Sequence, residues 1–349
     1  MFEINGTKIG IGLKPYIIAE LSANHGGDIQ RAKDSIRGAK EAGANAVKLQ
    51  TYTPDTMTLN SSKDDFLIKE GLWKGYNLYQ LYKEAYTPYE WHKELFSFAE
   101  LIGITIFSTP FDETAIDLLE DLNTPAYKIA SFELTDLPLI EYAASKKKPM
   151  LISTGMGSFE EIKEAILTCN KQGNNDILLF HCISKYPAKE KDYQLGDIKF
   201  LREKFKLEVG LSDHTISNMA SNLAISIGAC AIEKHFKLDD KECGPDSSFS
   251  LNANKFRILV DECNLSFEAS KINYLQRTES EKVNKKFRRS IYFIKELKKG
   301  HILKKEDIRR IRPGYGLEPK YFDEIVGMRL KKDVEKAEAV KWEYLEKTL

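Results

Sequence analysis

Eight short apolar runs alternate with eight helix-length amphipathic segments from Tyr16 onward. The runs are apolar throughout, which is typical of parallel strands covered by helices. Eight such units favour a closed (β/α)8 TIM barrel; the alternative is an open doubly wound sheet, but no G-x-G-x-x-G loop follows the first run. Helices are expected at 28–42, 88–102, 112–121, 136–146, 158–171, 196–205, 216–227 and 254–272.

The pattern changes after residue 273 to short strand-like pieces such as SIYFI and DIRRIRP, with turns at KKG and PGYG. A chain of 349 residues is long enough for one barrel and a small additional domain. We therefore expect a barrel over residues 1–275, a linker over 276–287 and a small, mostly β domain over 288–349.

The sequence carries no sign of membrane insertion or of a disulfide framework. No apolar run approaches the roughly 18 residues that span a bilayer, and the N-terminal MFEINGTKIG lacks the layout of a signal peptide. The five cysteines are widely spaced and form no CxxC pair, so we expect buried thiols. These features predict a cytoplasmic protein without a membrane partner.

Positive charge is concentrated in one stretch, although the net charge of the whole chain is zero. Residues 282–312 hold 13 Lys or Arg against 3 Asp or Glu, a net charge of +10. The neutral total and the absence of helix-turn-helix, RRM and zinc-finger patterns argue against a nucleic-acid partner. The sequence leaves two interpretations of this basic stretch: a solvated surface, or a surface that binds an anion.

Polar side chains gather where the predicted strands end, which is where barrel enzymes build their active sites. A buried charge at a strand end is costly unless it points into a polar site. A hydrogen-bonded strand terminus explains any single residue, whereas all the strand ends together indicate an active site. The strand-end residues are Glu20, Ser22, Asn24, His25, Lys48, Gln50, Ser108, Thr109, Lys128, Ser131, Glu133, Ser153, Thr154, His181, Ser212, Asp213, His214, Glu233, Lys234 and His235.

Two histidines and two lysines among them indicate the chemistry. His214 and His235 lie just past neighbouring apolar runs, and two imidazoles suit a divalent ion with coordination positions left open. Lys48 and Lys128, with the nearby hydroxyls, suit a phosphate or a carboxylate. The residues alone thus predict a metal-dependent lyase or transferase that acts on an anionic substrate.

The order of eight motifs resembles a known family: IAELSANHGG, KLQTYTPDT, FSTPFD, YKIASFE, ISTGM, GLSDH, IEKHF and IRPGYG. Together they resemble the sialic acid synthase family over essentially the whole chain, which implies a (β/α)8 barrel followed by an antifreeze-like (SAF) domain. KIASFE, GLWKGYNLYQLYKEAYTPYEWH and DSSFSL are most similar to the pseudaminic acid branch. Gly244, Pro245 and Asp246 are closer to the sialic and legionaminic branches, which remain the alternative.

The resemblance implies condensation of phosphoenolpyruvate with an open-chain amino sugar, giving a nonulosonic acid and phosphate. For the pseudaminic branch the sugar is 2,4-diacetamido-2,4,6-trideoxy-L-altropyranose. The implied cofactor is a divalent cation held by His214 and His235, with Mn2+ expected first and Mg2+ or Co2+ as alternatives. Glu20 is expected near the sugar aldehyde and Glu133 near the reacting centre, and either could activate water. The implied substrate-binding residues are Lys48, Gln50, Ser108, Thr109, Lys128, Ser131, Ser153, Tyr186, Ser212, Asp246 and Arg312.

Arg312 of IRPGYG is similar to an arginine that the small domain inserts into the active site of a second subunit, which implies a domain-swapped homodimer. By itself it could equally be a surface arginine in a basic stretch. Two rival functions remain. A metal-dependent aldolase or hydrolase would keep the histidines, and a carbohydrate-binding or ice-binding protein could be argued from the small domain alone.

Overall fold

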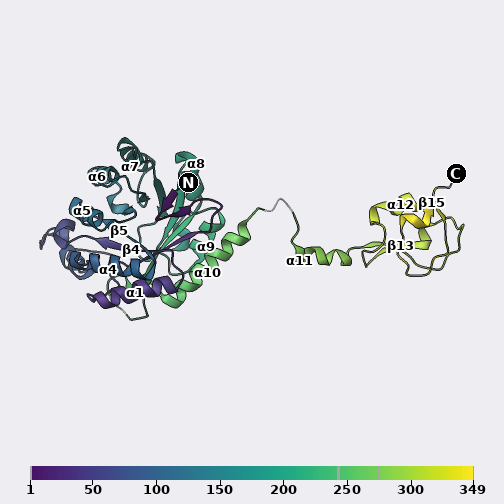
Figure 1. Cartoon of the computed structure of the whole chain (residues 1–349), viewed down its shortest axis with the longest axis horizontal. Coiled ribbons are helices and arrows are strands. Elements are labelled where there is room, and N and C mark those ends of the chain that lie inside the picture. The colour runs from purple at the N-terminus through teal and green to yellow at the C-terminus, as the bar shows by residue number, and fades with distance from the viewer. Residues whose placement is uncertain (1, 242–243, 273–275, 349) are drawn as a thin grey trace. The chain divides into compact units, whose positions relative to one another are not determined.

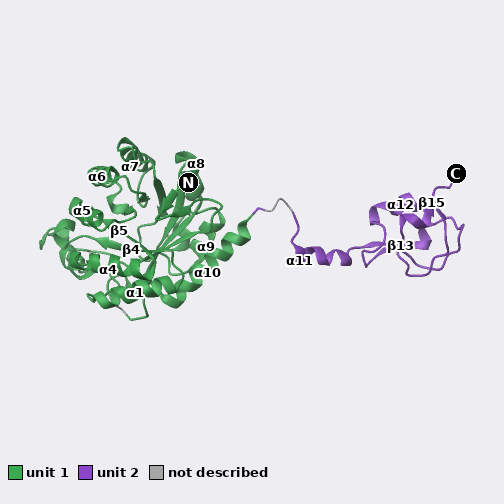
Figure 2. Ribbon diagram, in the orientation of Figure 1, with its two compact units in different colours: residues 1–271 green, residues 272–349 purple. Residues whose placement is uncertain are grey.

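The computed structural model describes residues 2–241, 244–272 and 276–348. The chain divides into two compact units, Met1–Lys271 and Ile272–Leu349, coloured separately in Figure 2. The division falls a few residues before position 275, the predicted end of the barrel domain. The stretch expected to be a linker contains a short helix, α11 (Glu279–Lys282), and a 3-10 helix, η5 (Val283–Phe287).

Eight parallel strands form a closed barrel in the first unit, which confirms the predicted (β/α)8 architecture (Figure 1). The last strand closes the ring because it pairs with both the first strand and the seventh. The barrel strands are β3 (Tyr16–Glu20), β4 (Ala46–Thr51), β5 (Thr105–Pro110), β6 (Tyr127–Ile129), β7 (Met150–Ser153), β8 (Ile177–Cys182), β9 (Glu208–Asp213) and β10 (Ala231–Lys237).

A helix covers the outside of the barrel after each strand, close to the predicted positions. Side chains fix several starts: Asp28 accepts a hydrogen bond from the backbone of Gln30, and Ser158 forms a reciprocal cap with Glu161. The covering helices are α1 (Ile29–Glu41), α4 (Tyr89–Ile102), α5 (Glu113–Asp121), α6 (Leu137–Ser145), α7 (Phe159–Lys171), α8 (Gly196–Phe205), α9 (Met219–Ser226) and α10 (Ala253–Ser270).

An antiparallel hairpin closes the amino end of the barrel. It consists of β1 (Phe2–Ile4) and β2 (Thr7–Ile9), and its side chains join one apolar cluster with the inward residues of the strands, such as Phe107 and Phe180. Burying an aromatic or aliphatic side chain of this size contributes roughly 1.5–3 kcal/mol. Because this end is filled with apolar groups, the polar residues of the interior are confined to the carboxyl end.

The two long connections add small elements at the carboxyl end. The first contains α2 (Pro54–Met57), a 3-10 helix η1 (Asp64–Phe66) and α3 (Leu78–Ala85); the second contains a 3-10 helix η4 (Ser247–Phe249) and β11 (Leu251–Asn252). The first connection joins β4 to α4 and the second joins β10 to α10, and side chains from both line the same cavity, on the face where barrel enzymes usually place functional loops. The two connections therefore contribute walls to the same space.

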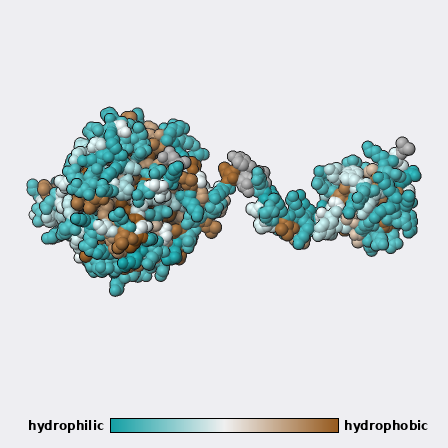
Figure 3. Space-filling model, viewed as in Figure 1, coloured by the Kyte–Doolittle hydropathy of each residue, from teal (hydrophilic) through white to brown (hydrophobic). Residues whose placement is uncertain are grey.

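Four of the five cysteines, Cys169, Cys182, Cys230 and Cys263, are buried free thiols, as predicted. Cys243 lies outside the described residues. Within the described part of the chain, the helices are all too short or too polar to cross a bilayer. On the face shown in Figure 3, hydrophilic residues cover most of the first unit and hydrophobic residues are scattered in small groups.

The second unit is small and consists of short antiparallel strand pairs joined by turns and short helical segments, so less of it is strand than the predicted mostly β domain. An apolar cluster that includes Ile291, Phe293 and Val340 forms its core. Part of its basic surface is paired, for example Lys295 with the buried Asp307 at 2.6 Å. Its elements include the strands β12 (Ser290–Phe293), β13 (Ile308–Ile311), β14 (Arg329–Leu330) and β15 (Leu345–Glu346) and the short helix α12 (Phe322–Ile325).

Candidate active site

An inner polar pocket lies at the carboxyl ends of the barrel strands. It collects residues that are far apart in the sequence, because parallel strands deliver their carboxyl ends to one face. Most residues predicted from the strand ends therefore meet here. The pocket is lined by Glu20, Lys48, Gln50, Thr109, Phe111, Lys128, Ala130, Ser131, Ser153, Cys182, Tyr186, Ser212, His214, Glu233 and His235.

Two lysines and two glutamates form buried ion pairs in this inner pocket. Lys48 Nζ lies 2.6 Å from Glu20 Oε2, and Lys128 Nζ lies 2.7 Å from Glu233 Oε2. Glu233 also lies 3.9 Å from Lys48, so its carboxylate is placed between the two ammonium groups. All four side chains are almost completely buried. Their opposite charges offset much of the cost of removing each one from water.

The environment moves the pKa values of these groups in different directions. Burial raises the pKa of Glu20, and the nearby Lys48 only partly opposes it. Burial also acts on Glu233, but Lys128 and Lys48 outweigh it and hold the pKa of Glu233 at about 2. Glu233 is thus a fixed negative charge. Burial lowers the pKa of Lys128 despite the attraction of Glu233.

Small hydroxyl groups surround the lysines. Lys48 Nζ donates to Thr109 Oγ1 at 3.0 Å, and Ser212 Oγ donates to Glu233 Oε1 at 3.1 Å. The backbone N–H of Gly155 donates to Ser131 Oγ at 3.1 Å. A Cβ on Gly155 would lie 2.7 Å from that Oγ, so only glycine fits there. Ammonium and hydroxyl donors in this density suit a phosphate or a carboxylate.

His214 and His235 lie at the edge of the inner pocket, with ring centroids 5.4 Å apart. His214 Nδ1 donates to the carbonyl oxygen of Ile183 at 2.9 Å, and its Nε2 lies 3.5 Å from Ser212 Oγ. His235 Nδ1 is buried and has no hydrogen-bond partner among the described residues. Burial first, and the neighbouring His214 next, lower the pKa of His235 well below its usual value.

This pair fits a divalent cation. A neutral imidazole with an unpaired nitrogen is a metal ligand, and Asp246 Oδ2 lies 3.8 Å from His235 Nδ1 without forming an ion pair to the neutral ring. No set of three His, Cys, Asp or Glu side chains in the described ranges is arranged around one point as metal ligands. The protein would therefore supply two imidazoles and leave coordination positions for substrate and water.

A wider cavity of about 380 Å³ opens next to the inner pocket, and its walls are largely apolar, with several aromatic side chains. Tyr186 belongs to both spaces, and its ring centroid lies 4.3 Å from that of His214. Trp73 Nε1 donates to the carbonyl oxygen of Pro245 at 3.1 Å and so joins the two long connections. The lining is Ser22, Gln50, Tyr52, Met57, Ile68, Trp73, Leu78, Leu81, Tyr82, Ala85, Phe111, Ala130, Phe132, Glu133, Tyr186, His235, Pro245 and Asp246.

Glu133 lies in this outer cavity, in a 3-10 helix, η2 (Ser131–Glu133), directly after β6. Its Oε2 is buried and meets no hydrogen-bond donor in the part of the chain that the structure describes. Burial raises the pKa of Glu133 to about 7. The structure therefore separates the two candidate bases: Glu20 lines the inner pocket, and Glu133 lines the outer cavity.

Of the residues assigned to substrate binding, Ser108 and Arg312 line neither space; of the other strand-end residues, Asn24, His25, Thr154, His181, Asp213 and Lys234 also line neither. Ser108 is on the outer face of β5, 2.6 Å from Thr51 Oγ1, because side chains alternate along a strand and Thr109 takes the inward position. The prediction that Ser108 binds substrate is therefore not supported. Arg312 is exposed on the second unit, next after β13, and its role stays a prediction. Glu233, a strand-end residue for which the sequence predicts no specific role, also lines the inner pocket; its place two residues before His235 on β10 is the sequence signal for this position.

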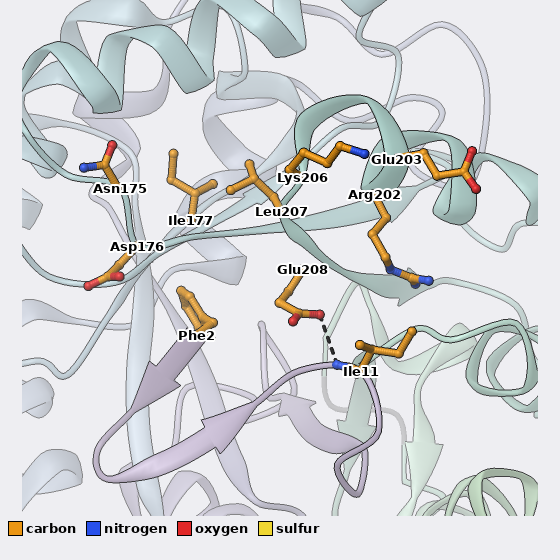
Figure 4. A pocket seen from close by; sticks show the side chains of 10 residues that line it. All are labelled: Phe2, Ile11, Asn175, Asp176, Ile177, Arg202, Glu203, Lys206, Leu207 and Glu208. Atoms are coloured by element: carbon orange, nitrogen blue, oxygen red, sulfur yellow. Dashed lines mark hydrogen bonds between the residues drawn. The ribbon is translucent and has the colours of Figure 1, made fainter. Parts of the chain in front are cut away.

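A separate pocket lies at the opposite end of the barrel, near the first hairpin, and Figure 4 shows its lining. It mixes acidic and basic groups, among them Asp176, Arg202 and Glu208, whose carboxylate accepts a hydrogen bond from the backbone of Ile11. None of the predicted site residues lines it. The candidate active site is therefore the pair of spaces at the carboxyl end.

A family model described as the NeuB family matches residues 35–272, and one described as the SAF domain matches residues 288–346. The chain belongs to the NeuB family. It is 44% identical over 328 residues to a pseudaminic acid synthase of Campylobacter jejuni, covering 94% of this chain and 96% of that protein. It is 46% identical over 326 residues to the pseudaminic acid synthase of Helicobacter pylori, covering 91% and 94%.

The fold is also similar to that of a protein of known structure. The spore coat polysaccharide biosynthesis protein SpsE of Bacillus subtilis superposes with a TM-score of 0.67 at 31% identity, covering 100% of this chain and 99% of that chain. These findings confirm the resemblance to the sialic acid synthase family that the motifs predicted.

Proposed function

We propose that this member of the NeuB family is a pseudaminic acid synthase, a transferase that joins phosphoenolpyruvate to 2,4-diacetamido-2,4,6-trideoxy-L-altrose in its open-chain form. The curated relatives at 44% and 46% identity support the reaction. The structural observation that carries the proposal is the junction at Tyr186 between an inner pocket of lysines and an outer aromatic cavity. An anionic three-carbon donor suits the first, and a sugar with apolar substituents suits the second.

The inner pocket is proposed to bind phosphoenolpyruvate. Lys48 and Lys128 supply positive charge, and Thr109, Ser131, Ser153 and Ser212 supply hydroxyl groups around them. Hydrogen bonds from ionised donors to an anion are stronger than those between neutral groups. These residues would hold the phosphate and the carboxylate, and would stabilise the phosphate dianion as it leaves.

His214 and His235 are proposed to hold Mn2+, with Mg2+ or Co2+ as alternatives. When bound, the cation would polarise the sugar aldehyde as a Lewis acid. Gln50 reaches the same region, because its Nε2 donates to Glu20 Oε1 at 2.8 Å and to Ser22 Oγ at 3.2 Å. Gln50 and Asp246 line the outer cavity next to His235 and are proposed to orient the sugar.

The proposed reaction begins when C3 of phosphoenolpyruvate attacks the aldehyde carbon of the sugar. The C=O π bond of the aldehyde opens, and its oxygen takes up a proton to become a hydroxyl. Positive charge develops at C2 and water adds there. The new C2 hydroxyl then loses its proton as the C–O bond to phosphate breaks, which leaves a ketone and inorganic phosphate. A carboxylate must accept the proton of the water. We favour Glu20 for this step, because it lies in the inner pocket with the lysines, whereas Glu133 lines the cavity proposed for the sugar.

The outer cavity supports a 6-deoxy sugar with two acetamido groups. Tyr52, Tyr82 and Phe132 present apolar surface that suits methyl groups and leaves a 6-hydroxyl without a partner. Sialic and legionaminic acid synthesis remain the alternative functions within the family. A homodimer in which Arg312 of the second unit enters the site of the other subunit is proposed from the family resemblance, as is a cytoplasmic location.

The test is an incubation with phosphoenolpyruvate, Mn2+ and each candidate sugar, namely 2,4-diacetamido-2,4,6-trideoxy hexoses and N-acetylmannosamine. We expect phosphate release and a nonulosonic acid, identified by mass and NMR, with the L-altro sugar. A product from another sugar alone would assign the protein to the sialic or legionaminic acid branch of the family. Absence of phosphate release with all of them would favour the rival aldolase or hydrolase.

A further inference from the structure

The neighbouring strands β9 and β10 carry paired polar residues on both faces of the barrel wall. In their register, Ser212 is opposite Glu233, and Asp213 is opposite Lys234. Ser212 and Glu233 point inward and are hydrogen bonded at 3.1 Å. Asp213 and Lys234 point outward, toward α9 and α10, because side chains alternate along a strand. Each of these two charged residues immediately precedes one of the site histidines.

Lys234 is one of the most deeply buried charged side chains of the barrel, with 1% of its side chain exposed. Its Nζ lies 2.8 Å from Asp213 Oδ2. It also donates to the backbone carbonyl oxygens of Thr215 at 2.7 Å and of Ser217 at 2.8 Å. A single ammonium group therefore holds the connection from β9 to α9 against β10.

Asp213 is equally buried, and both of its carboxylate oxygens are hydrogen bonded. Oδ1 accepts from the backbone N–H and the hydroxyl of Thr215, each at 2.8 Å, and Oδ2 accepts from Ser221 Oγ at 2.6 Å. The backbone on both sides of His214 is thus fixed by contacts to the Asp213–Lys234 pair. Lys234 fixes the position of the backbone directly before His235 in the same way.

Stability alone is a weak explanation for this arrangement. Taking two charges out of water is costly, and apolar residues of similar volume often stabilise a fold as well as a buried ion pair does. What the pair supplies is a fixed orientation of the backbone, because the ammonium group and both carboxylate oxygens each bond to several defined partners around the two histidines. The backbone is oriented in this way at His214 and His235, whose imidazole ring centroids lie 5.4 Å apart on the inner side of the barrel wall.

We propose that the Asp213–Lys234 ion pair is a positioning element that sets the separation of the His214 and His235 imidazoles for a divalent cation. The inference rests on the proposed function only for its assumption that the histidine pair binds the cation. Hydrogen-bonded partners behind metal ligands typically change metal affinity by about 10–100-fold when removed.

The experiment measures Mn2+ affinity in the absence of both substrates, by electron paramagnetic resonance of the free ion. The test variant is the double substitution Asp213→Asn and Lys234→Met, which leaves no unpaired buried charge. We expect its dissociation constant for Mn2+ to rise at least 10-fold while circular dichroism shows a folded barrel. Leu259→Ala, a change to a fully buried residue of α10, is the control for general loss of stability and should keep the wild-type affinity.

Thr215→Val is the milder variant if the double variant does not fold, because it removes one hydroxyl from the network and keeps the volume and the backbone. It should weaken Mn2+ binding by a smaller factor. Wild-type affinity in the folded double variant, or in Thr215→Val when the double variant is unfolded, would overturn the proposal. So would equal weakening in Leu259→Ala, or a wild-type protein that does not bind Mn2+. Turnover assayed separately with phosphoenolpyruvate decides the proposed function independently.

Discussion

The carboxylate of Glu233 accepts a hydrogen bond of 2.7 Å from the ammonium group of Lys128, in a part of the barrel where both side chains are buried. The same carboxylate lies 3.9 Å from Lys48. Before any substrate binds, Glu233 therefore supplies the negative charge that keeps two lysines together in the inner pocket. A bound anionic substrate would supply part of this negative charge.

Glu233→Gln should destabilise the free protein by about 3–5 kcal/mol, because it leaves the buried ammonium group of Lys128 without its ion-pair partner. Addition of phosphoenolpyruvate should raise the melting temperature of this variant more than that of the wild type, since the ligand replaces the lost charge. Differential scanning fluorimetry with and without ligand measures both effects. The control is Glu120→Gln, which removes a partly exposed partner of Lys148 and should show no extra ligand response.

His214→Ala and His235→Ala should each abolish turnover and leave the fold intact, because each removes one of the two proposed ligands. Phosphate release assays and circular dichroism check the two parts of this prediction. Near-normal activity of either variant in metal-free buffer would refute the metal assignment. Wild-type protein dialysed against a chelator should lose activity and regain it with Mn2+.

Glu133 should make the protein less stable as the pH rises. Its pKa is about 7 when folded, against 4.5 for an ordinary glutamate, so the folded state binds the proton more tightly between these values. The contribution is fully present below about pH 4.5 and is lost by pH 7 and above. From pH 5.5 to 8.5 the wild type should lose about 2 kcal/mol relative to Glu133→Gln.

Urea unfolding of both proteins at the two pH values measures this difference. A constant difference in the free energy of unfolding would show that Glu133 does not titrate in this range. Glu133→Gln also tests whether Glu133 or Glu20 activates water. If Glu20 activates water, Glu133→Gln should change KM for the sugar more than kcat.

Phe132→Gly should reduce the preference for the 6-deoxy sugar over N-acetylmannosamine. Phe132 is 62% exposed and lines the outer cavity, so the change removes apolar surface without opening the core. Discrimination by apolar contact is worth about 1–3 kcal/mol per group, or roughly 10-fold or more in the ratio of kcat/KM. Phe200→Ala, an exposed aromatic on α8, is the control. Equal turnover of both sugars by the wild type would refute this source of specificity.

Arg312→Ala should be nearly inactive if the guanidinium binds an acyl oxygen of the sugar in the other subunit, where lysine would not substitute well. A mixture of the Arg312→Ala and His235→Ala proteins should then regain part of the activity, since a mixed dimer contains one complete site. Mass spectrometry of the mixture verifies subunit exchange. If exchange occurs and activity does not return, Arg312 does not act across an interface.

The sequence by itself determined the barrel and most of the site. Continuous apolar runs separated by amphipathic segments specify strands buried between an interior and a layer of helices. Once the strands are parallel, their carboxyl ends share one face, so Lys48, Lys128, His214 and His235 had to come close together. The motifs then identified the family, which the comparisons confirm.

Only the tertiary structure decided which side of the wall each strand-end residue faces. A one-residue difference in register exchanges inside and outside, and this put Ser108 behind the barrel and Thr109 in the pocket. Asp213 and Lys234 pair through the register of the neighbouring strands β9 and β10, whereas Glu233 on β10 pairs with Lys128 on β6 across the barrel interior. Local sequence encodes neither pairing. These charged residues are far apart in the chain. They form ion pairs only in the closed barrel, because it removes both side chains from water and brings them into contact.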